Sequence, residues 1–255
     1  MAVSIKSERE IQLMRQSNHL LAEVYVELEK IIEPGISTWD IDHEGERLIR
    51  ACGGIPNFLH YEGYPASVCV SVNEEVVHGI PKKNHILKEG DIVSLDMGLI
   101  YEGYHSDAAR TFPIGKISPE AQKLIDVTRQ SFFEGMKFAK AGHHLHEISG
   151  AIGDYAESFG FGVVRDLVGH GIGTKMHEDP QIPNFRCKSR GVLLRPGMTL
   201  AVEPMITAGT WEVKWMDDDW TVVTADGSLA AHYENTILIT EGDPEILTMV
   251  DGQPY

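Results

Sequence analysis

The sequence lacks the features that mark secreted and membrane proteins. Its 255 residues include three cysteines, Cys52, Cys69 and Cys187, and no CxxC pair. This odd, scattered set favours reduced thiols over a disulfide framework or a cysteine-ligated zinc site. No stretch approaches the ~20 apolar residues of a spanning helix, and the N-terminus lacks the apolar core of a signal peptide. We therefore expect a cytoplasmic protein with no membrane association.

Basic residues are also scarce. The chain has 22 basic against 38 acidic residues, which gives a formal net charge of -16. Such a chain lacks the broad positive surface that follows a phosphate backbone, so specific DNA binding is not expected. Hydrophobic residues make up 42% and charged residues 24%, close to the globular average. The length suits one core, and we expect one domain over residues 1–255.

Apolar spacing and turn residues predict a chain that mixes helices with strands. Helices are expected at 7–33, 38–52, 119–139 and 145–159. Strands are expected at 67–72 and 91–100, in YHSDAARTF after the turn at Glu102–Gly103, and in FGVV, MTLAVEPMI, TVVTADGSLA and HYENTILIT. The order of helices followed by strands occurs twice.

Short segments of the chain resemble one another, which indicates a duplication. The matching pairs are GISTWDI (35–41) with GHHLHEI (142–148), HGI (78–80) with HGI (170–172), and LKEGDIVSLD (87–96) with LRPGMTLAVE (194–203). The first and third pairs are both 107 residues apart. We expect two halves, about 7–112 and 118–239, that pack about a pseudo-two-fold axis with a site at their interface.

Two acids, Asp96 and Asp107, fall on neighbouring strands of the predicted hairpin. If the hairpin turns at Tyr101–Glu102, these acids face each other, and a turn one residue later shifts the pairing only slightly. Like charges across a strand pair repel, so the arrangement needs a proton or a cation between them. A metal ion is the simpler solution.

Three further residues extend this pair into a predicted metal site. The duplication makes Glu203 equivalent to Asp96, Glu234 lies in an apolar-rich strand where an unpaired charge is costly, and His170 matches His78 in the repeated HGI. Any one acid alone is more often a solvated surface charge. Four carboxylates and one imidazole together suit divalent manganese, iron, cobalt or zinc.

These segments together resemble the methionine aminopeptidases of the pita-bread metallopeptidase family. The matching motifs are VSLDMG with Asp96, YHSDAART with Asp107, GHGIG with His170, AVEPM with Glu203 and HYENT with Glu234. The resemblance covers nearly the whole chain and is to the short bacterial type I class. It implies an α+β pita-bread fold, in which two duplicated halves form a curved antiparallel sheet covered by helices, and a single catalytic domain.

The resemblance also implies a cofactor of two divalent metal ions, with cobalt, manganese, iron, zinc and nickel as the candidates. Asp96 would chelate one ion, Asp107 and Glu234 would bridge both, and His170 with Glu203 would complete the coordination of the other ion. A hydroxide shared by the two ions would then attack the first peptide bond.

Catalysis and substrate binding are assigned by the same resemblance. Glu203 would transfer a proton, His177 and a metal would stabilise the oxyanion, and His78 with His177 would bind the peptide. A methionine pocket would be formed by Phe58, Tyr61, Tyr64, Cys69, Met176 and Trp220, although core packing is an equal alternative for each aromatic. Glu62 and Met176 depart from the residues often found at these places in the family.

The implied function is removal of the N-terminal methionine from nascent polypeptides by a cytoplasmic monomer. The basic cluster of Arg186, Lys188 and Arg190 has two interpretations, transient contact with the ribosome or a solvated surface loop, and the solvated loop is the more common case. One alternative is an Xaa-Pro aminopeptidase or dipeptidase, which usually carries an added N-terminal domain. The other is a non-enzymatic pita-bread binding protein, which typically loses several metal ligands.

Overall fold

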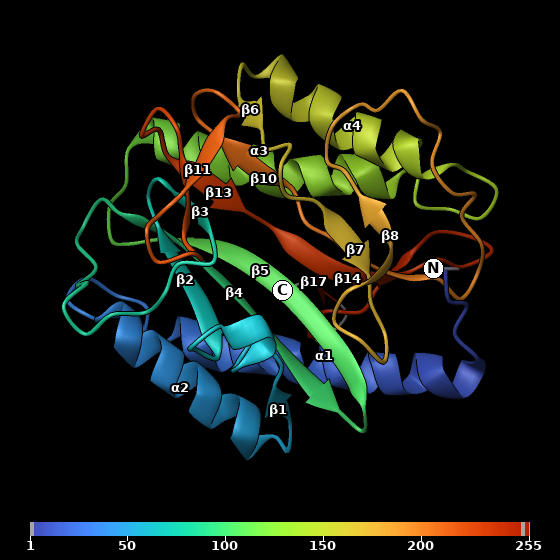
Figure 1. Cartoon of the computed structure of the whole chain (residues 1–255), viewed down its shortest axis with the longest axis horizontal. Helices are drawn as coiled ribbons and strands as arrows, with labels where there is room; N and C mark the ends of the chain where they lie inside the picture. The colour runs from blue at the N-terminus through green and yellow to red at the C-terminus, as the bar shows by residue number, and fades with distance from the viewer. Residues whose placement is uncertain (1–2, 251–252, 255) are drawn as a thin grey trace.

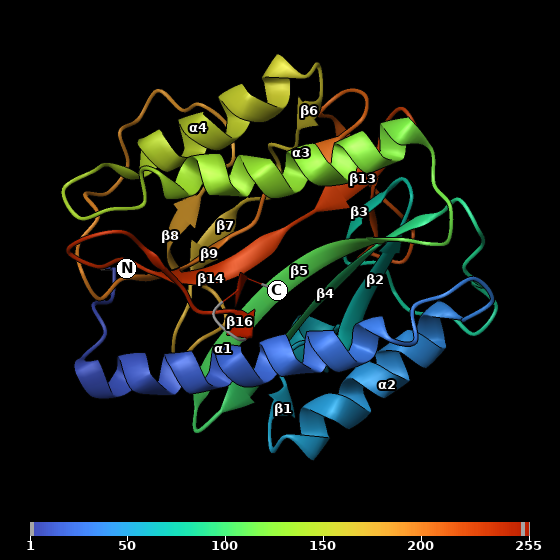
Figure 2. The same cartoon turned by 180° about the vertical axis from the view of Figure 1, so that it is seen from behind.

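The structure is a computed structural model that describes residues 3–250 and 253–254. Its helices α1 and α3 lie in front of the strands when the molecule is seen from behind, so helices cover one face of the sheet (Figure 1, Figure 2). The α-helices are α1 (Glu8–Glu29), α2 (Thr38–Ala51), α3 (Pro119–Met136) and α4 (Leu145–Ser158). Within the described residues, none of them combines the length and the apolar character needed to cross a bilayer.

A nine-stranded antiparallel sheet forms the centre of the molecule. Its order is β1 (Ile55–Pro56), β4 (Ile92–Tyr101), β5 (Tyr104–Pro113), β14 (Glu234–Leu238), β9 (Thr199–Val202), β7 (Gly169–Gly171) and β8 (Glu178–Ile182). In addition, β2 (Val68–Val72) pairs with β4, and β15 (Glu245–Ile246) pairs with β14. The strand β14 thus joins the first half of the chain to the second.

Smaller elements border this sheet. One three-stranded sheet contains β13 (Ala230–His232), β10 (Met205–Thr207) and β6 (Gly162–Val163), and another contains β11 (Val213–Trp215), β12 (Val222–Thr224) and β3 (Glu75–Val77). A short 3-10 helix, η1, spans Tyr61–Gly63, and β16 (Met249–Val250) pairs with β17 (Gln253–Pro254). The predicted strands MTLAVEPMI and HYENTILIT are each divided in two, at Glu203–Pro204 and at Tyr233.

The first helix is shorter than its apolar pattern predicts. It begins after Ser7, whose side chain caps the backbone N–H of Glu10, and it ends at Glu29 rather than at residue 33. The N–H groups of Ile31 and Ile32 bond three residues back instead of four, which tightens the chain. Proline disfavours a helical residue before it, and Pro34 lies just beyond.

The duplication seen in the sequence is repeated in the fold. Both ends of α4 lie 107 positions after those of α2, and β9 begins 107 positions after β4. The isolated bridge between Ser37 and Ile86 recurs, at the same spacing, between His144 and Leu193. Residues 107 positions apart therefore occupy matching positions in the two halves, and the matching residues Asp96 and Glu203 line the same cavity.

The hairpin of β4 and β5 turns one residue later than the predicted pairing assumed. Tyr101 pairs with Tyr104, so the turn residues are Glu102 and Gly103, which have φ values of 49° and 83°. These values are typical of a type I′ turn, which requires positive φ at both central residues. Asp96 therefore pairs with Ala109 rather than with Asp107, and the two acids are diagonal neighbours on one face of the sheet.

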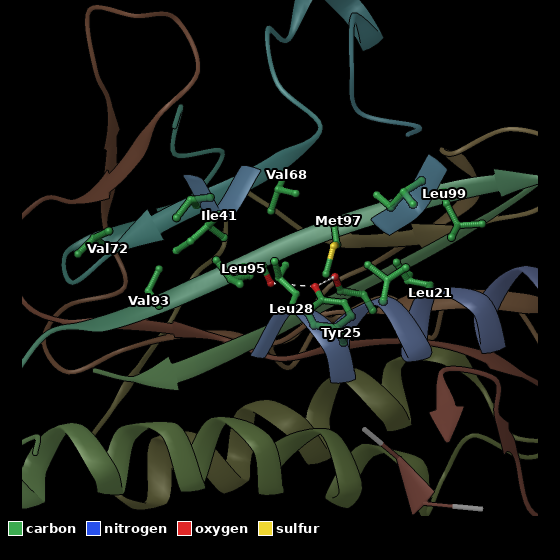
Figure 3. Close-up of a cluster of buried hydrophobic side chains, with 14 of the residues drawn as sticks. Leu21, Tyr25, Leu28, Ile41, Val68, Val72, Val93, Leu95, Met97 and Leu99 are labelled. Atoms are coloured by element: carbon green, nitrogen blue, oxygen red, sulfur yellow. Dashed lines mark hydrogen bonds between the residues drawn. The ribbon is translucent and has the colours of Figure 1, made fainter. Parts of the chain in front are cut away.

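The main core lies between α1, α2 and the strands β2 and β4 (Figure 3). Leu21, Leu28 and Met97 are fully buried there. The hydroxyl of Tyr25 donates to the carbonyl oxygens of Leu95 and Ala108, which fastens α1 to β4 and β5. This packing fixes one face of β4, so that its other face is free to carry the site.

We expect Leu28→Ala to destabilise the protein by about 2–5 kcal/mol, because it leaves a cavity in this core. Leu28→Met keeps most of the volume and serves as the control, with an expected loss below about 1.5 kcal/mol. Urea unfolding of both variants measures the difference. Equal losses would show that the core collapses freely around residue 28.

Candidate metal centre

Four carboxylates are brought together by the order of the central strands. Asp96 lies on β4, Asp107 on β5, Glu234 at the start of β14 and Glu203 just after β9. Ala109 pairs with Asp96 on one side and with Glu234 on the other. Directly paired residues project to the same face of a sheet, so these acids point the same way.

An imidazole completes the group. His170 lies on β7 opposite Ala201 of β9, and its Nε2 is 3.7 Å from Asp107 Oδ2 and 3.6 Å from Glu203 Oε1. Its Nδ1 lies 2.9 Å from the carbonyl oxygen of Gly171. That contact places the ring proton on Nδ1 and leaves the Nε2 lone pair facing the carboxylates, as a metal-binding histidine requires.

The electrostatics of the group call for positive charge. Burial raises the pKa of Asp96 to about 8. Burial, and then the charges of neighbouring carboxylates, raise the pKa of Asp107, Glu203 and Glu234 well above the usual range. Burial also lowers the pKa of His170 to about 3, so this ring stays neutral and supplies no charge. Without a cation the acids must hold protons.

The residues fit divalent metal ions. Asp96 Oδ1, Asp107 Oδ1 and Glu234 Oε1 are buried and have no hydrogen-bond partner, which in a folded protein indicates a bound ion or water. Ligand atoms of Asp107, His170 and Glu234 all lie within 4.8 Å of one another. Asp96 and Glu203 lie outside this tightest group but line the same cavity.

The group faces a cavity with a volume of about 280 Å³, and all of the predicted site residues line this cavity. These are Phe58, Tyr61, Tyr64, Cys69, His78, Asp96, Asp107, His170, Met176, His177, Glu203, Trp220 and Glu234. The sequence interpretation missed Val77, Leu167, Val168 and Met205 as lining residues, and left Glu62 out of the predicted set. Most of these directly flank a predicted motif, so their proximity to it was the available signal.

Two histidines flank the opening of the carboxylate group. His177 is exposed at the rim, and its Nδ1 lies 2.8 Å from the Tyr61 hydroxyl. Its ring centroid is 4.4 Å from that of His170. His78 has a φ of 59° and precedes Gly79, where a Cβ would lie 2.4 Å from the Val70 carbonyl oxygen. Desolvation lowers the pKa of His78 to about 4, so its ring is neutral at ordinary pH.

An apolar wall adjoins the carboxylates. Cys69 of β2 pairs directly with Asp96 of β4, so the wall and the acids share one face of the sheet. The rings of Tyr64 and Trp220 meet edge to face at 5.2 Å, and Met176 is buried in the same cluster. A ligand in the cavity would therefore contact carboxylates at one end and soft, polarizable groups at the other.

Comparison with known proteins identifies the family. The model of metallopeptidase family M24 matches residues 12–241. The chain belongs to this family. It is 54% identical over 249 residues to a methionine aminopeptidase of Clostridium acetobutylicum, a match that covers 98% of this chain and 100% of the relative. It is 50% identical to methionine aminopeptidase 1 of Bacillus subtilis, over 96% of this chain and 98% of the relative.

Solved structures give the same answer for the fold. A methionine aminopeptidase of Thermotoga maritima superposes with a TM-score of 0.95 at 45% identity, covering 98% of this chain and 100% of the other. An Xaa-Pro dipeptidase of Bacillus anthracis has a TM-score of 0.79 at 24% identity and shows the shared fold alone. The predicted family, the pita-bread fold and the assignment as a metallopeptidase are confirmed.

We expect the metal-free protein to lose stability as the pH rises from about 4 to about 8. An acid whose pKa is higher in the folded than in the unfolded protein stabilises the fold only while protonated, and that contribution is lost as pH rises through the folded value. For Asp96 the pKa rises from 3.8 to about 8. Urea unfolding of chelator-treated protein across this range measures the trend.

The same titration with Mn²⁺ in excess is the control. A bound cation favours the ionised carboxylates, so the loss of stability with pH should disappear or reverse. A metal-free protein whose stability stays level over this range would show that the carboxyls are not desolvated as the structure indicates.

Proposed function

We propose that this protein removes the N-terminal methionine from polypeptides by hydrolysis that depends on two metal ions. One observation carries the proposal: a single cavity joins the four-carboxylate group to a wall of aromatic, thiol and thioether side chains. High identity to methionine aminopeptidases over the full chain supports it. Location in the cytoplasm, a monomeric state, a single catalytic domain and ribosome contact stay predictions.

The metal ions would be held by the five residues of the carboxylate and imidazole group. In the strand order, Asp107 on β5 and Glu234 on β14 lie between Asp96 on β4 and the pair of Glu203 and His170, and all five would hold the ions. Divalent ions bound there would lower the pKa of water and polarise a peptide carbonyl. Their oxygen-rich ligand set suits cobalt, manganese, iron, zinc or nickel.

His177 is placed to donate a hydrogen bond to the reacting carbonyl oxygen. If the Tyr61 hydroxyl donates to Nδ1, the neutral His177 ring carries its proton on Nε2. Although His177 is exposed at the rim, partial desolvation of its ring by the cavity wall lowers its pKa, which favours the neutral ring. A neutral donor aimed at a developing negative charge stabilises the transition state without needing a proton from solvent.

Glu203 is the best placed of the four acids to move a proton. Its side chain is 14% exposed, whereas that of Asp107 is 5% exposed. A carboxylate at this more open edge of the group would accept a proton from the attacking water and pass it to the departing amine.

The cavity also accounts for action at a free N-terminus. Its inner end carries the five predicted metal ligands, and a divalent ion held there would bind the free α-amine of a polypeptide. Cys69 pairs directly with Asp96, and Tyr64 and Trp220 belong to the same apolar cluster as Cys69. A methionine side chain fits this wall because its flexible, polarizable thioether packs well against aromatic rings.

The decisive experiment is hydrolysis of a Met-Ala-Ser peptide by chelated and then metal-reconstituted protein. We expect activity to vanish with chelator, to return with Mn²⁺ or Co²⁺, and to be absent in Asp107→Ala. An Xaa-Pro peptide is the matched substrate and should not be cleaved. Cleavage of the Xaa-Pro peptide alone would assign the prolidase activity instead, and activity that ignores chelator would refute a metal mechanism.

We expect His177→Ala to lower kcat on the same peptide about 100-fold to 1000-fold, the usual cost of removing one oxyanion donor. His177 is exposed, so the substitution should leave the free energy of unfolding unchanged within about 0.5 kcal/mol. Steady-state kinetics with a metal-binding titration measures both. Loss of metal affinity in this variant would contradict the assigned role, because His177 would then be acting as a ligand.

A further inference from the structure

The molecule contains a second cavity with a volume of about 260 Å³. It is lined by Glu29, Arg110, Thr111, Phe112, Ile125, Thr128, Arg129, His232 and Tyr233, none of which lines the first cavity. His232 connects the two regions, because its Nε2 lies 3.9 Å from Glu203 Oε2. Nothing in the proposed peptidase mechanism uses this second space.

Arg110 is a buried cation beside this cavity. Its residue is 6% exposed, and its hydrogen bonds reach only neutral groups: the carbonyl oxygens of Ala109 and Glu234 and the side-chain oxygen of Asn235. Its Nε has no hydrogen-bond partner. No carboxylate of residues 3–250 forms an ion pair with it. A buried charge of this kind is costly unless a counter-charge lies near.

The metal centre does not supply that counter-charge once it is loaded. Glu234 is near enough for its charge to act on Arg110, but its carboxylate lines the other cavity, where two divalent cations would balance it. Arg110 would then gain from a negative group in the second cavity.

Other donors of the same cavity also lack partners. The Tyr233 hydroxyl and the Nδ1 of His232 are buried without a hydrogen bond, and the ring of Tyr233 lies 4.4 Å from the Arg110 guanidinium. Arg129 adds an exposed guanidinium, with no ion pair among the described residues, and Glu29 is the single acid of the lining. The lining thus carries the two positive charges of Arg110 and Arg129 and the one negative charge of Glu29, which leaves it with a net positive charge.

We propose that this second cavity binds a small oxyanion, a phosphate or a carboxylate group, between Arg110 and Arg129. Guanidinium groups recognise both through paired N–H donors in a fixed plane. The Tyr233 hydroxyl supplies a neutral donor for a remaining oxygen atom, and His232 supplies a second in the tautomer that carries its proton on Nδ1. The inference is independent of the peptidase proposal, because no residue of the catalytic machinery lines this cavity.

Calorimetric titration of the metal-loaded protein with inorganic phosphate, and separately with acetate, tests the proposal against chloride at matched ionic strength. We expect saturable binding of one of the two oxyanions. Arg129→Gln should weaken it about tenfold, the loss expected for one charge-assisted hydrogen bond. Glu29→Gln should strengthen it, since it removes a like charge from the lining.

Lys123→Gln is the matched control, because Lys123 lies on the same helix as Arg129 and does not line the cavity. It removes the same charge from the protein and should leave the affinity unchanged. Phosphate held by the metal ions would bind equally well to Arg129→Gln, and that result would overturn the proposal. Equal weakening by Lys123→Gln, or no binding beyond that of chloride, would overturn it as well.

Discussion

The structure depends on one electrostatic constraint, the crowding of four carboxylates on one face of the central sheet. Asp96, Asp107, Glu203 and Glu234 come from strands or strand ends that are neighbours in the order β4, β5, β14 and β9. Their repulsion is relieved only by protons or by cations, because the neutral ring of His170 offers no charge. The fold therefore holds a metal site ready and carries a cost whenever that site is empty of cations.

Much of this arrangement could be predicted from the sequence because its signals are local. Helix caps, glycines and apolar spacing predict α2 and α4, and the spacing of 107 residues relates these two helices within the sequence itself. That repeat also made Glu203 the counterpart of Asp96. Residue chemistry then favoured a metal ion, because five such groups in matching contexts are seldom all surface charges.

The remaining features depend on contacts between distant segments. The sequence does not show that β14 pairs with β5, and this pairing alone puts Glu234 and Asp96 on either side of Ala109. The sequence predicts the turn at Glu102–Gly103, and the structure confirms it, but the direct pairing of Asp96 with Asp107 assumed a turn one residue earlier. The observed pairing of Asp96 with Ala109 follows from positive φ at both turn residues. Likewise, Arg110 and Asn235 meet across 125 positions of the chain, which no local pattern reports.

Selectivity and catalysis are linked through a single strand register. Cys69 belongs to the apolar wall and Asp96 to the acidic group, yet they are directly paired on β2 and β4. A slip of one residue would turn Cys69 toward the helices and Val68 or Val70 toward the cavity. The packing of Val68 and Val70 against α1 and α2 opposes that slip. The hydrophobic core thereby sets the position of the proposed methionine pocket relative to the proposed metal ligands.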